Sequence, residues 1–119
     1  MSRYRFAIVA AVLVVFVAVG AYLIFGNKSA GPQNVTFNVT VTGAKSMHPG
    51  ELSAHHNDTV TINITSDTEG EVHLHGYDIA FDTKPGQVVS HTFEAANTGS
   101  FEIEWESTTT HLGDLTVNP

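Results

Sequence analysis

The sequence contains no cysteine. This absence excludes disulfide bonds, thiolate nucleophiles, iron–sulfur clusters and every metal site that needs a thiolate ligand. A folded domain of this chain on the export side of a membrane therefore depends on its hydrophobic core alone. The sequence also has no phosphate-binding loop, no nucleophile–base pair at a readable spacing and no catalytic motif. We therefore expect a binding protein and not an enzyme.

Basic residues are scarce as well. The chain has 5 Lys and Arg against 12 Asp and Glu, which gives a formal net charge of −7 at pH 7 and an isoelectric point near 5.3. A negative surface repels nucleic acid and anionic lipid headgroups. Neither is expected as a partner.

The chain has one long apolar run, Phe6–Phe25, which carries no charge. At ~1.5 Å per residue, a helix over this run is long enough to cross a hydrocarbon layer of ~30 Å. Arg3 and Arg5 precede the run and only Lys28 follows closely, so the charge bias keeps the N-terminus in the cytoplasm. The run therefore predicts a single-pass membrane anchor.

This prediction divides the chain into a cytoplasmic N-terminus over residues 1–5, an uncleaved signal anchor over 6–25, a linker over 26–33 and an extracytoplasmic domain over 34–119. The linker is rich in Gly, Ser, Asn and Pro, as flexible connections are. Small residues around Ala18–Gly20 leave a cleaved signal peptide as the alternative.

The rest of the chain alternates between apolar and polar residues, with turn residues between the runs and no helical period. Runs of this kind predict β-strands. They cover Asn34–Thr42, Thr59–Thr65, Glu71–Asp82 with a bend at Gly76, Gln87–Ala95, Phe101–Glu106 and His111–Val117. Gly43–Asp58 has no period and is predicted to be a long loop. Six or seven short strands predict an all-β domain, an antiparallel β-sandwich or barrel.

The run Phe101–Glu106 alternates most regularly. Its Phe, Ile and Trp side chains are expected to point inward, and its three glutamates outward as a solvated face, with a partner-binding acidic stripe as the alternative. His91, in the strand Gln87–Ala95, is expected to be partly buried and is given no role.

His73 and His75 stand one residue apart in an alternating run, so both imidazoles should lie on one face with Val72 and Leu74 on the other. Two imidazoles in this arrangement can offer two nitrogen donors to one zinc or copper ion. Gly76 lets the backbone bend directly after the pair. The competing interpretation is two histidines on a solvated strand face.

Several segments together resemble the cupredoxin framework, over roughly residues 34–119. They are Asn57-Asp-Thr-Val-Thr-Ile, Glu71-Val-His-Leu-His-Gly-Tyr-Asp, Lys84-Pro-Gly, Phe93, Gly99-Ser-Phe-Glu-Ile and Gly113-Asp-Leu-Thr-Val. The likeness is to membrane-anchored or lipid-anchored cupredoxin-like domains, similar to those of periplasmic iron-uptake proteins and of cytochrome oxidase subunit II. It implies an antiparallel Greek-key β-sandwich. The segment His-Leu-His-Gly also resembles a copper-ligand segment of multicopper oxidases.

In the cupredoxin family a copper ion lies at one end of the sandwich. The resemblance puts His75 in the place of the family's strand histidine and His111 in the place of its axial methionine. The cysteine place falls near Ile103 or Trp105, where no thiol exists, so blue-copper electron transfer is not expected. The loop-histidine place falls in Glu106–Thr109, where Glu106 is a potential oxygen ligand.

The predicted metal ligands are therefore His75, His111 and His73, and the predicted ion is copper, with zinc second. The expected function is a membrane-tethered domain that binds copper through histidines. The alternative is a metal-free cupredoxin-like scaffold or interaction domain that partners a membrane protein complex. His48, His55 and His56 lie in the predicted loop. We expect them to be ordinary exposed polar residues, with weak copper binding as the alternative.

Overall fold

The computed structural model describes residues 31–119. The predicted cytoplasmic residues 1–5, the predicted anchor over 6–25 and most of the predicted linker over 26–33 lie outside the described residues. Within residues 31–119, no helix has the length and apolar character needed to span a bilayer.

Nine strands and one short 3-10 turn make up the described domain. The strands are β1 (Asn34–Thr42), β2 (Ser46–His48), β3 (Glu51–His55), β4 (Thr59–Ser66), β5 (Gly70–Leu74), β6 (Ile79–Thr83), β7 (Val88–Glu94), β8 (Gly99–Trp105) and β9 (Thr110–Asn118), and the turn is η1 (Glu106–Thr108). The predicted all-β class is confirmed.

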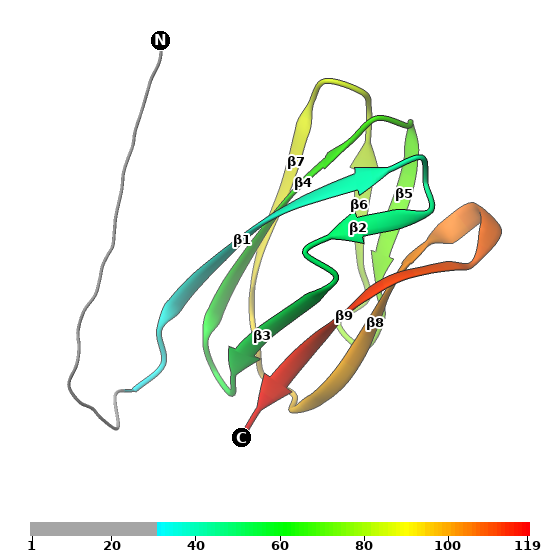
Figure 1. Ribbon diagram of the computed structural model, residues 1–119. Coiled ribbons are helices and arrows are strands. Elements are labelled where there is room, and N and C mark those ends of the chain that lie inside the picture. Colours follow the sequence, from blue (N-terminus) through cyan, green and yellow to red (C-terminus); the bar gives the residue numbers. More distant parts are fainter. Residues whose placement is uncertain (1–30) are drawn as a thin grey trace, which may run out of the picture. The chain divides into compact units, whose positions relative to one another are not determined.

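The strands form two sheets (Figure 1). One sheet has four strands in the order β2-β1-β4-β7, and the other has five in the order β3-β9-β8-β5-β6. Buried side chains from both sheets form one hydrophobic core, with Val39 and Ile62 from the first sheet and Leu74 and Leu115 from the second. Two sheets that share one core are a β-sandwich.

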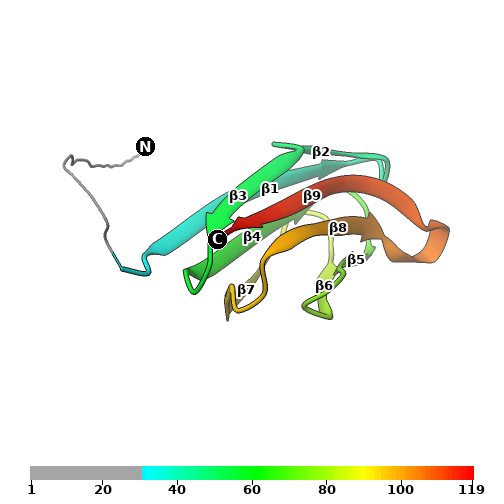
Figure 2. The same ribbon diagram turned by 90° about the horizontal axis from the view of Figure 1, so that it is seen from below.

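The expectation of a purely antiparallel sandwich is wrong, because both sheets are mixed. β1 pairs with β4 in parallel, and β3 pairs with β9 in parallel. In Figures 1 and 2, β3 and β9 lie side by side with their arrowheads pointing the same way. A period of two reports which face of a strand is buried, and it carries no information on the direction of the neighbouring strand.

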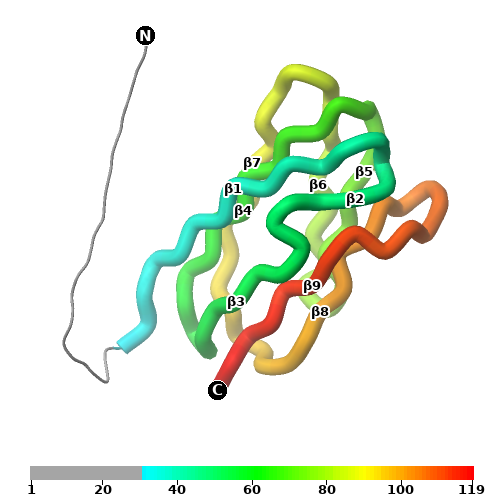
Figure 3. The backbone as a smooth tube through the Cα atoms, viewed as in Figure 1, coloured from blue at the N-terminus to red at the C-terminus, as the bar shows by residue number. Residues whose placement is uncertain are grey.

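The predicted loop Gly43–Asp58 is also wrong, because it contains β2 and β3. β2 pairs with β1 in the four-stranded sheet, and β3 pairs with β9 in the other, so the chain crosses between the sheets at Pro49 and Gly50. The tube in Figure 3 shows this change of direction. Met47, Leu52 and Ala54 are buried in the core. The two segments alternate for too few residues to show a clear period.

The run Glu71–Asp82 is a hairpin of β5 and β6 that turns after His75. Gly76 lies in this turn with φ +83°, a left-handed conformation that favours glycine. A Cβ at this position would overlap the ring of Phe101. The bend expected at Gly76 is therefore present, and both its backbone angle and its neighbour require glycine.

His91 is exposed on β7, so the expectation of partial burial is wrong. β7 is the edge strand of the four-stranded sheet. The His91 ring packs edge-on against Phe81, with centroids 4.9 Å apart. An edge strand has a neighbour on one side only, so its side chains stay accessible from the other.

Candidate metal centre

His73 and His75 lie on the outer face of the five-stranded sheet. Val72 and Leu74 alternate with them and are fully buried in the core. The two histidines must therefore point away from the core, as the alternation predicts. The His75 backbone N–H donates to the carbonyl of Glu102, 2.9 Å away, so the pairing of β5 with β8 continues past the end of β5.

The two imidazoles are close neighbours. Their ring centroids are 4.4 Å apart, and the ring planes make an angle of 33°. Alternate residues of a strand share one face of the sheet, so the two rings can meet there. His73 therefore shares one small region of the sheet face with His75.

Glu104 completes this region from the neighbouring strand. His73 and Glu104 are opposite each other in the pairing of β5 with β8. His75 Nε2 is hydrogen-bonded to Glu104 Oε1. One potential ligand atom from each of His73, His75 and Glu104 lies within 4.8 Å of the other two. These three side chains could hold one metal ion.

The expectation of a fully solvated glutamate row is wrong for Glu104, which is only 9% exposed. β8 is the central strand of its sheet, so side chains from β5 and β9 cover its outer face. The pairing of β8 with β9 is irregular at Ile103 and Glu104, where Ile103 faces Gly113 and Glu104 faces His111. A carboxylate buried in this way is stable only with hydrogen-bond or charge partners.

His73 also contacts two exposed carboxylates. Its Nδ1 lies 3.1 Å from Glu106 Oε1, and its Nε2 lies 3.2 Å from Asp78 Oδ1. Burial, the largest single influence on the pKa of His73, lowers it. The hydrogen bonds to Glu106 and Asp78 and the negative charges of these carboxylates together outweigh burial, so the pKa of His73 is raised above 6.5.

A second group of potential ligands adjoins the first. Glu71, His73 and Glu106 each offer an atom within 4.8 Å of the other two. Glu71 precedes His73 by two residues on β5, and Glu106 follows the end of β8 as the first residue of η1. His73 therefore belongs to both groups.

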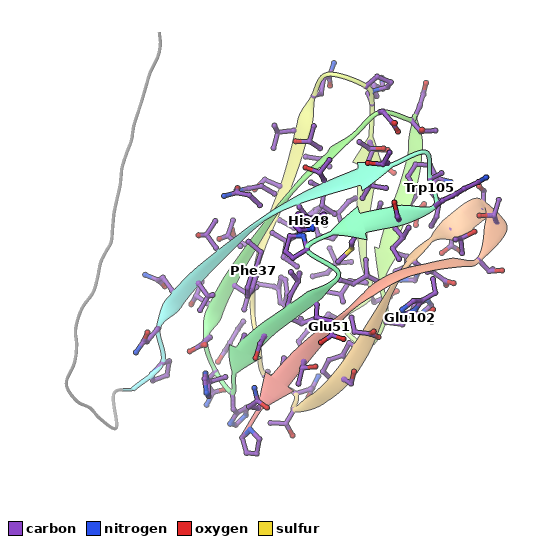
Figure 4. The ribbon with its side chains drawn as sticks, in the orientation of Figure 1. Phe37, His48, Glu51, Glu102 and Trp105 are labelled. Atoms are coloured by element: carbon purple, nitrogen blue, oxygen red, sulfur yellow. The ribbon has the colours of Figure 1, made fainter. Side chains whose placement is uncertain are left out.

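His111 lies on β9, opposite Glu104 in the strand pairing, and its ring contacts two other carboxylates. Its Nδ1 is 2.9 Å from Glu102 Oε2 and its Nε2 is 3.4 Å from Asp114 Oδ2. Figure 4 labels Glu102 on β8. The hydrogen bond to Glu102 raises the pKa of His111 above 6.5. Within residues 31–119, His111 belongs to neither of the two ligand groups.

The positions that correspond to the family's cysteine hold apolar core residues. Ile103 is 3% exposed and Trp105, labelled in Figure 4, is 4% exposed. The Trp105 indole packs so closely on Gly70 that a Cβ at Gly70 would overlap it. The loop-histidine place is the turn η1. Neither place therefore supplies a nitrogen or sulfur ligand.

The other histidines stay apart from this region. His48 ends β2, opposite Thr40 of β1, and His55 ends β3. His56 Nε2 contacts the carbonyl oxygen of Ala96 at 3.1 Å. Among the described residues, none of these three histidines belongs to a group of three potential metal ligands.

Two imidazoles and one carboxylate suit Zn(II) in an open site and Cu(II) in a nitrogen–oxygen site. The sequence interpretation identified His73 and His75 and missed Glu104 as a neighbour. The alternation of Phe101–Glu106 indicates a solvated outer face, so the sequence carries no signal for the burial of Glu104.

No model of a known protein family matches the sequence, and no curated protein matches it. Solved structures do resemble the fold. A copper binding protein in its apo form, solved by NMR, has a TM-score of 0.60 and 13% identity over 78% of this chain and 97% of that chain. A chain of a heme-copper terminal oxidase dimer has a TM-score of 0.59 and 17% identity over 69% of this chain.

A blue copper oxidase from Nitrosomonas europaea has a TM-score of 0.54 and 15% identity over 72% of this chain. The match spans 63% of the terminal oxidase chain and 39% of the blue copper oxidase chain. At these identities the likeness shows the fold alone. The described domain has a cupredoxin-like fold, and the resemblance seen in the sequence is confirmed at that level.

Proposed function

We propose that this domain binds a copper ion, or a zinc ion, through His73, His75 and Glu104, without blue-copper electron transfer. The observation that carries the proposal is the mutual approach of three potential ligand atoms within 4.8 Å on one sheet face. Copper-binding proteins with the same fold support the choice of copper.

The strand pairing supplies preorganisation. His73 and His75 are fixed by the alternation of β5, and Glu104 is fixed by the central strand β8. Little conformational freedom of these side chains is then lost on binding, which favours affinity. A divalent cation would also compensate the charge of the largely buried Glu104 carboxylate.

His111 is proposed as a fourth donor. It stands opposite Glu104 on β9, so a rotation of its side chain away from Glu102 and Asp114 would direct the ring toward the same ion. Zn(II) prefers four ligands in a tetrahedral arrangement, and Cu(II) accepts a tetragonal one. Binding would then exchange two ion-pair contacts of His111 for one metal bond.

We also propose that the domain is tethered outside the cytoplasmic membrane by Phe6–Phe25. The support is the uncharged run and the preceding Arg3 and Arg5. Protease added to intact cells should then digest the domain. A mature protein that begins after residue 20 and is free in the medium would exclude the tether.

One observation favours a second candidate function, a metal-free interaction domain. Each of His73, His75 and His111 already has a carboxylate hydrogen-bond partner. Such pairs satisfy the imidazoles without an ion, so the same face could bind another protein of a membrane complex. The two candidates differ in one measurable property, the affinity for metal.

Calorimetric titration of the purified full chain with Cu(II) and with Zn(II) tests the proposal. We expect one tightly bound ion in the wild type and loss of tight binding in His73→Ala and in His75→Ala. The double variant His55→Ala/His56→Ala is the matched control and should bind like the wild type. Equal affinity in wild type, His73→Ala and His75→Ala would place the site elsewhere, and no binding to the wild type would favour the metal-free function.

A further inference from the structure

The second ligand group on the sheet face differs from the first in its chemistry and in its exposure. Glu71, His73 and Glu106 offer two carboxylates and one imidazole, whereas His73, His75 and Glu104 offer two imidazoles and one carboxylate. The Glu106 side chain is 48% exposed, and the Glu104 side chain is 11% exposed. The oxygen-rich group therefore presents the more exposed carboxylate, while in the other group the exposed member is the His75 ring, at 42%.

His73 is common to both groups, and this limits how they can be used. A neutral imidazole offers one nitrogen lone pair, and its other nitrogen carries a proton. Without deprotonation of the ring, His73 can therefore bind one ion at a time. The two groups are alternative positions for a single ion, close enough for it to move between them while it stays near His73.

We propose that Glu71, His73 and Glu106 form a capture position, which a divalent copper or zinc ion occupies before it reaches His73, His75 and Glu104. This inference rests on the proposed function. In the transfer step, the bonds from the ion to Glu71 and Glu106 break, and bonds to His75 and Glu104 form. No electron moves, and the ion keeps its charge.

Charge and ligand preference both favour movement in this direction. All 12 acidic residues of the chain lie in residues 51–114, and Lys45 and Lys84 are the only Lys or Arg beyond residue 30, so the domain attracts cations. Copper and zinc bind imidazole well, so a site with two imidazoles retains the ion better than a site with one. The carboxylates of Glu71 and Glu106 speed arrival, and the nitrogen-rich group sets the affinity.

The test is the rate of metal loading in the double variant Glu71→Gln/Glu106→Gln. The matched control is Glu51→Gln/Glu94→Gln, which removes the same charge at two exposed positions outside both groups. Glu51 is labelled in Figure 4. Stopped-flow quenching of the single tryptophan, Trp105, by Cu(II) follows loading of the full chain, and a competing chelator follows release.

A capture position lies on the path in both directions, so its loss slows loading and release alike and leaves the equilibrium affinity nearly unchanged. We expect both rates to fall about tenfold in Glu71→Gln/Glu106→Gln, which is the smallest loss usual when a group around a metal site is altered. The dissociation constant should stay within about threefold of wild type. The control double variant should change each quantity less than about threefold, as loss of distant surface charge does.

Three results would overturn the inference. Unchanged loading and release rates would show that the ion reaches its site directly. If the affinity fell by as large a factor as the loading rate, Glu71 and Glu106 would either bind the ion in its final site or act only by attracting it electrostatically. Equal slowing in the control would assign the effect to net charge. In all three cases wild-type affinity stays intact, whereas failure of the proposed function removes binding to the wild type itself.

Discussion

The rings of His73 and His75 lie 4.4 Å apart on the outer face of the five-stranded sheet. Alternate residues of a strand share one face of the sheet, so the two rings can meet there. The chain turns directly after His75. Gly76 makes that turn with φ +83° and leaves room for the Phe101 ring. The pair of imidazoles thus stands directly before the turn that joins β5 to β6.

Glu104→Gln should lower the affinity for Cu(II) and Zn(II) by at least about tenfold, because the variant loses the anionic ligand and keeps the shape of the side chain. Calorimetric titration measures the change. The amide still hydrogen-bonds His75, so the variant should unfold cooperatively like the wild type. The control Glu51→Gln, which changes an exposed residue outside both ligand groups, should cost much less affinity. Equal affinity in wild type and Glu104→Gln would remove Glu104 from the site.

The copper-loaded protein should be pale. No cysteine exists in the chain, so no thiolate-to-copper charge transfer can give an intense visible band. Electron spin resonance should report a tetragonal nitrogen–oxygen site. An intense blue or red band in pure copper-loaded protein would contradict this expectation.

The apo protein should lose stability as the pH rises above ~6.5, the ordinary pKa of histidine. The pKa values of His73 and His111 are raised in the folded state, so folding binds their protons more tightly than the unfolded chain does. Their stabilising contribution is complete below the unfolded pKa of ~6.5 and disappears as the pH rises through the folded values. Denaturant unfolding at a series of pH values measures this slope, which His111→Gln should reduce. An unchanged slope would contradict the role of the Glu102 contact.

The same shift affects metal binding. A ligand imidazole must be neutral, and the raised pKa keeps His73 protonated to a higher pH than a free histidine. As the pH is lowered, the apparent affinity for the metal should therefore begin to fall while the pH is still above ~6.5, the ordinary pKa of histidine.

Gly70→Ala should destabilise the domain by about 1–3 kcal/mol, the usual cost of adding a methyl group to a filled core. The new Cβ would overlap the Trp105 indole. Thermal or denaturant unfolding followed by tryptophan fluorescence measures the loss. Gly50→Ala is the control, because a Cβ there meets only the Met47 carbonyl oxygen at an ordinary 3.7 Å. Equal stability of the two variants would show that the contact yields at little cost.

The sequence predicts the all-β fold and the positions of the regular strands, because long alternating runs report burial directly. On β9, for example, the alternating residues Leu115 and Val117 are both fully buried. β2 and β3 escape prediction because their alternation is short. The parallel pairing of β1 with β4 and of β3 with β9 could not be predicted, because the sequence of one strand does not indicate the direction of its neighbour.

The candidate site, too, could be predicted only in part from the sequence. The spacing of His73 and His75 predicts their common face, since that is a local property of one strand. The approach of Glu104 depends on the register between β5 and β8, and the direction of the His111 ring depends on Glu102 and Asp114. Register and rotamer are long-range outcomes, so His111 as a ligand stays a prediction that only metal binding can test.

The most direct test is to follow the imidazole nitrogen chemical shifts of all seven histidines by NMR as Zn(II) is added to the full chain. A bound ion shifts the nitrogen that coordinates it and fixes the tautomer of the ring. We predict that the signals of His73 and His75 change up to one equivalent of zinc and then stop, while those of His48, His55 and His56 do not change. If every imidazole signal stays unchanged, or if only the signals of those three histidines change, a metal site on the outer face of the sheet is contradicted.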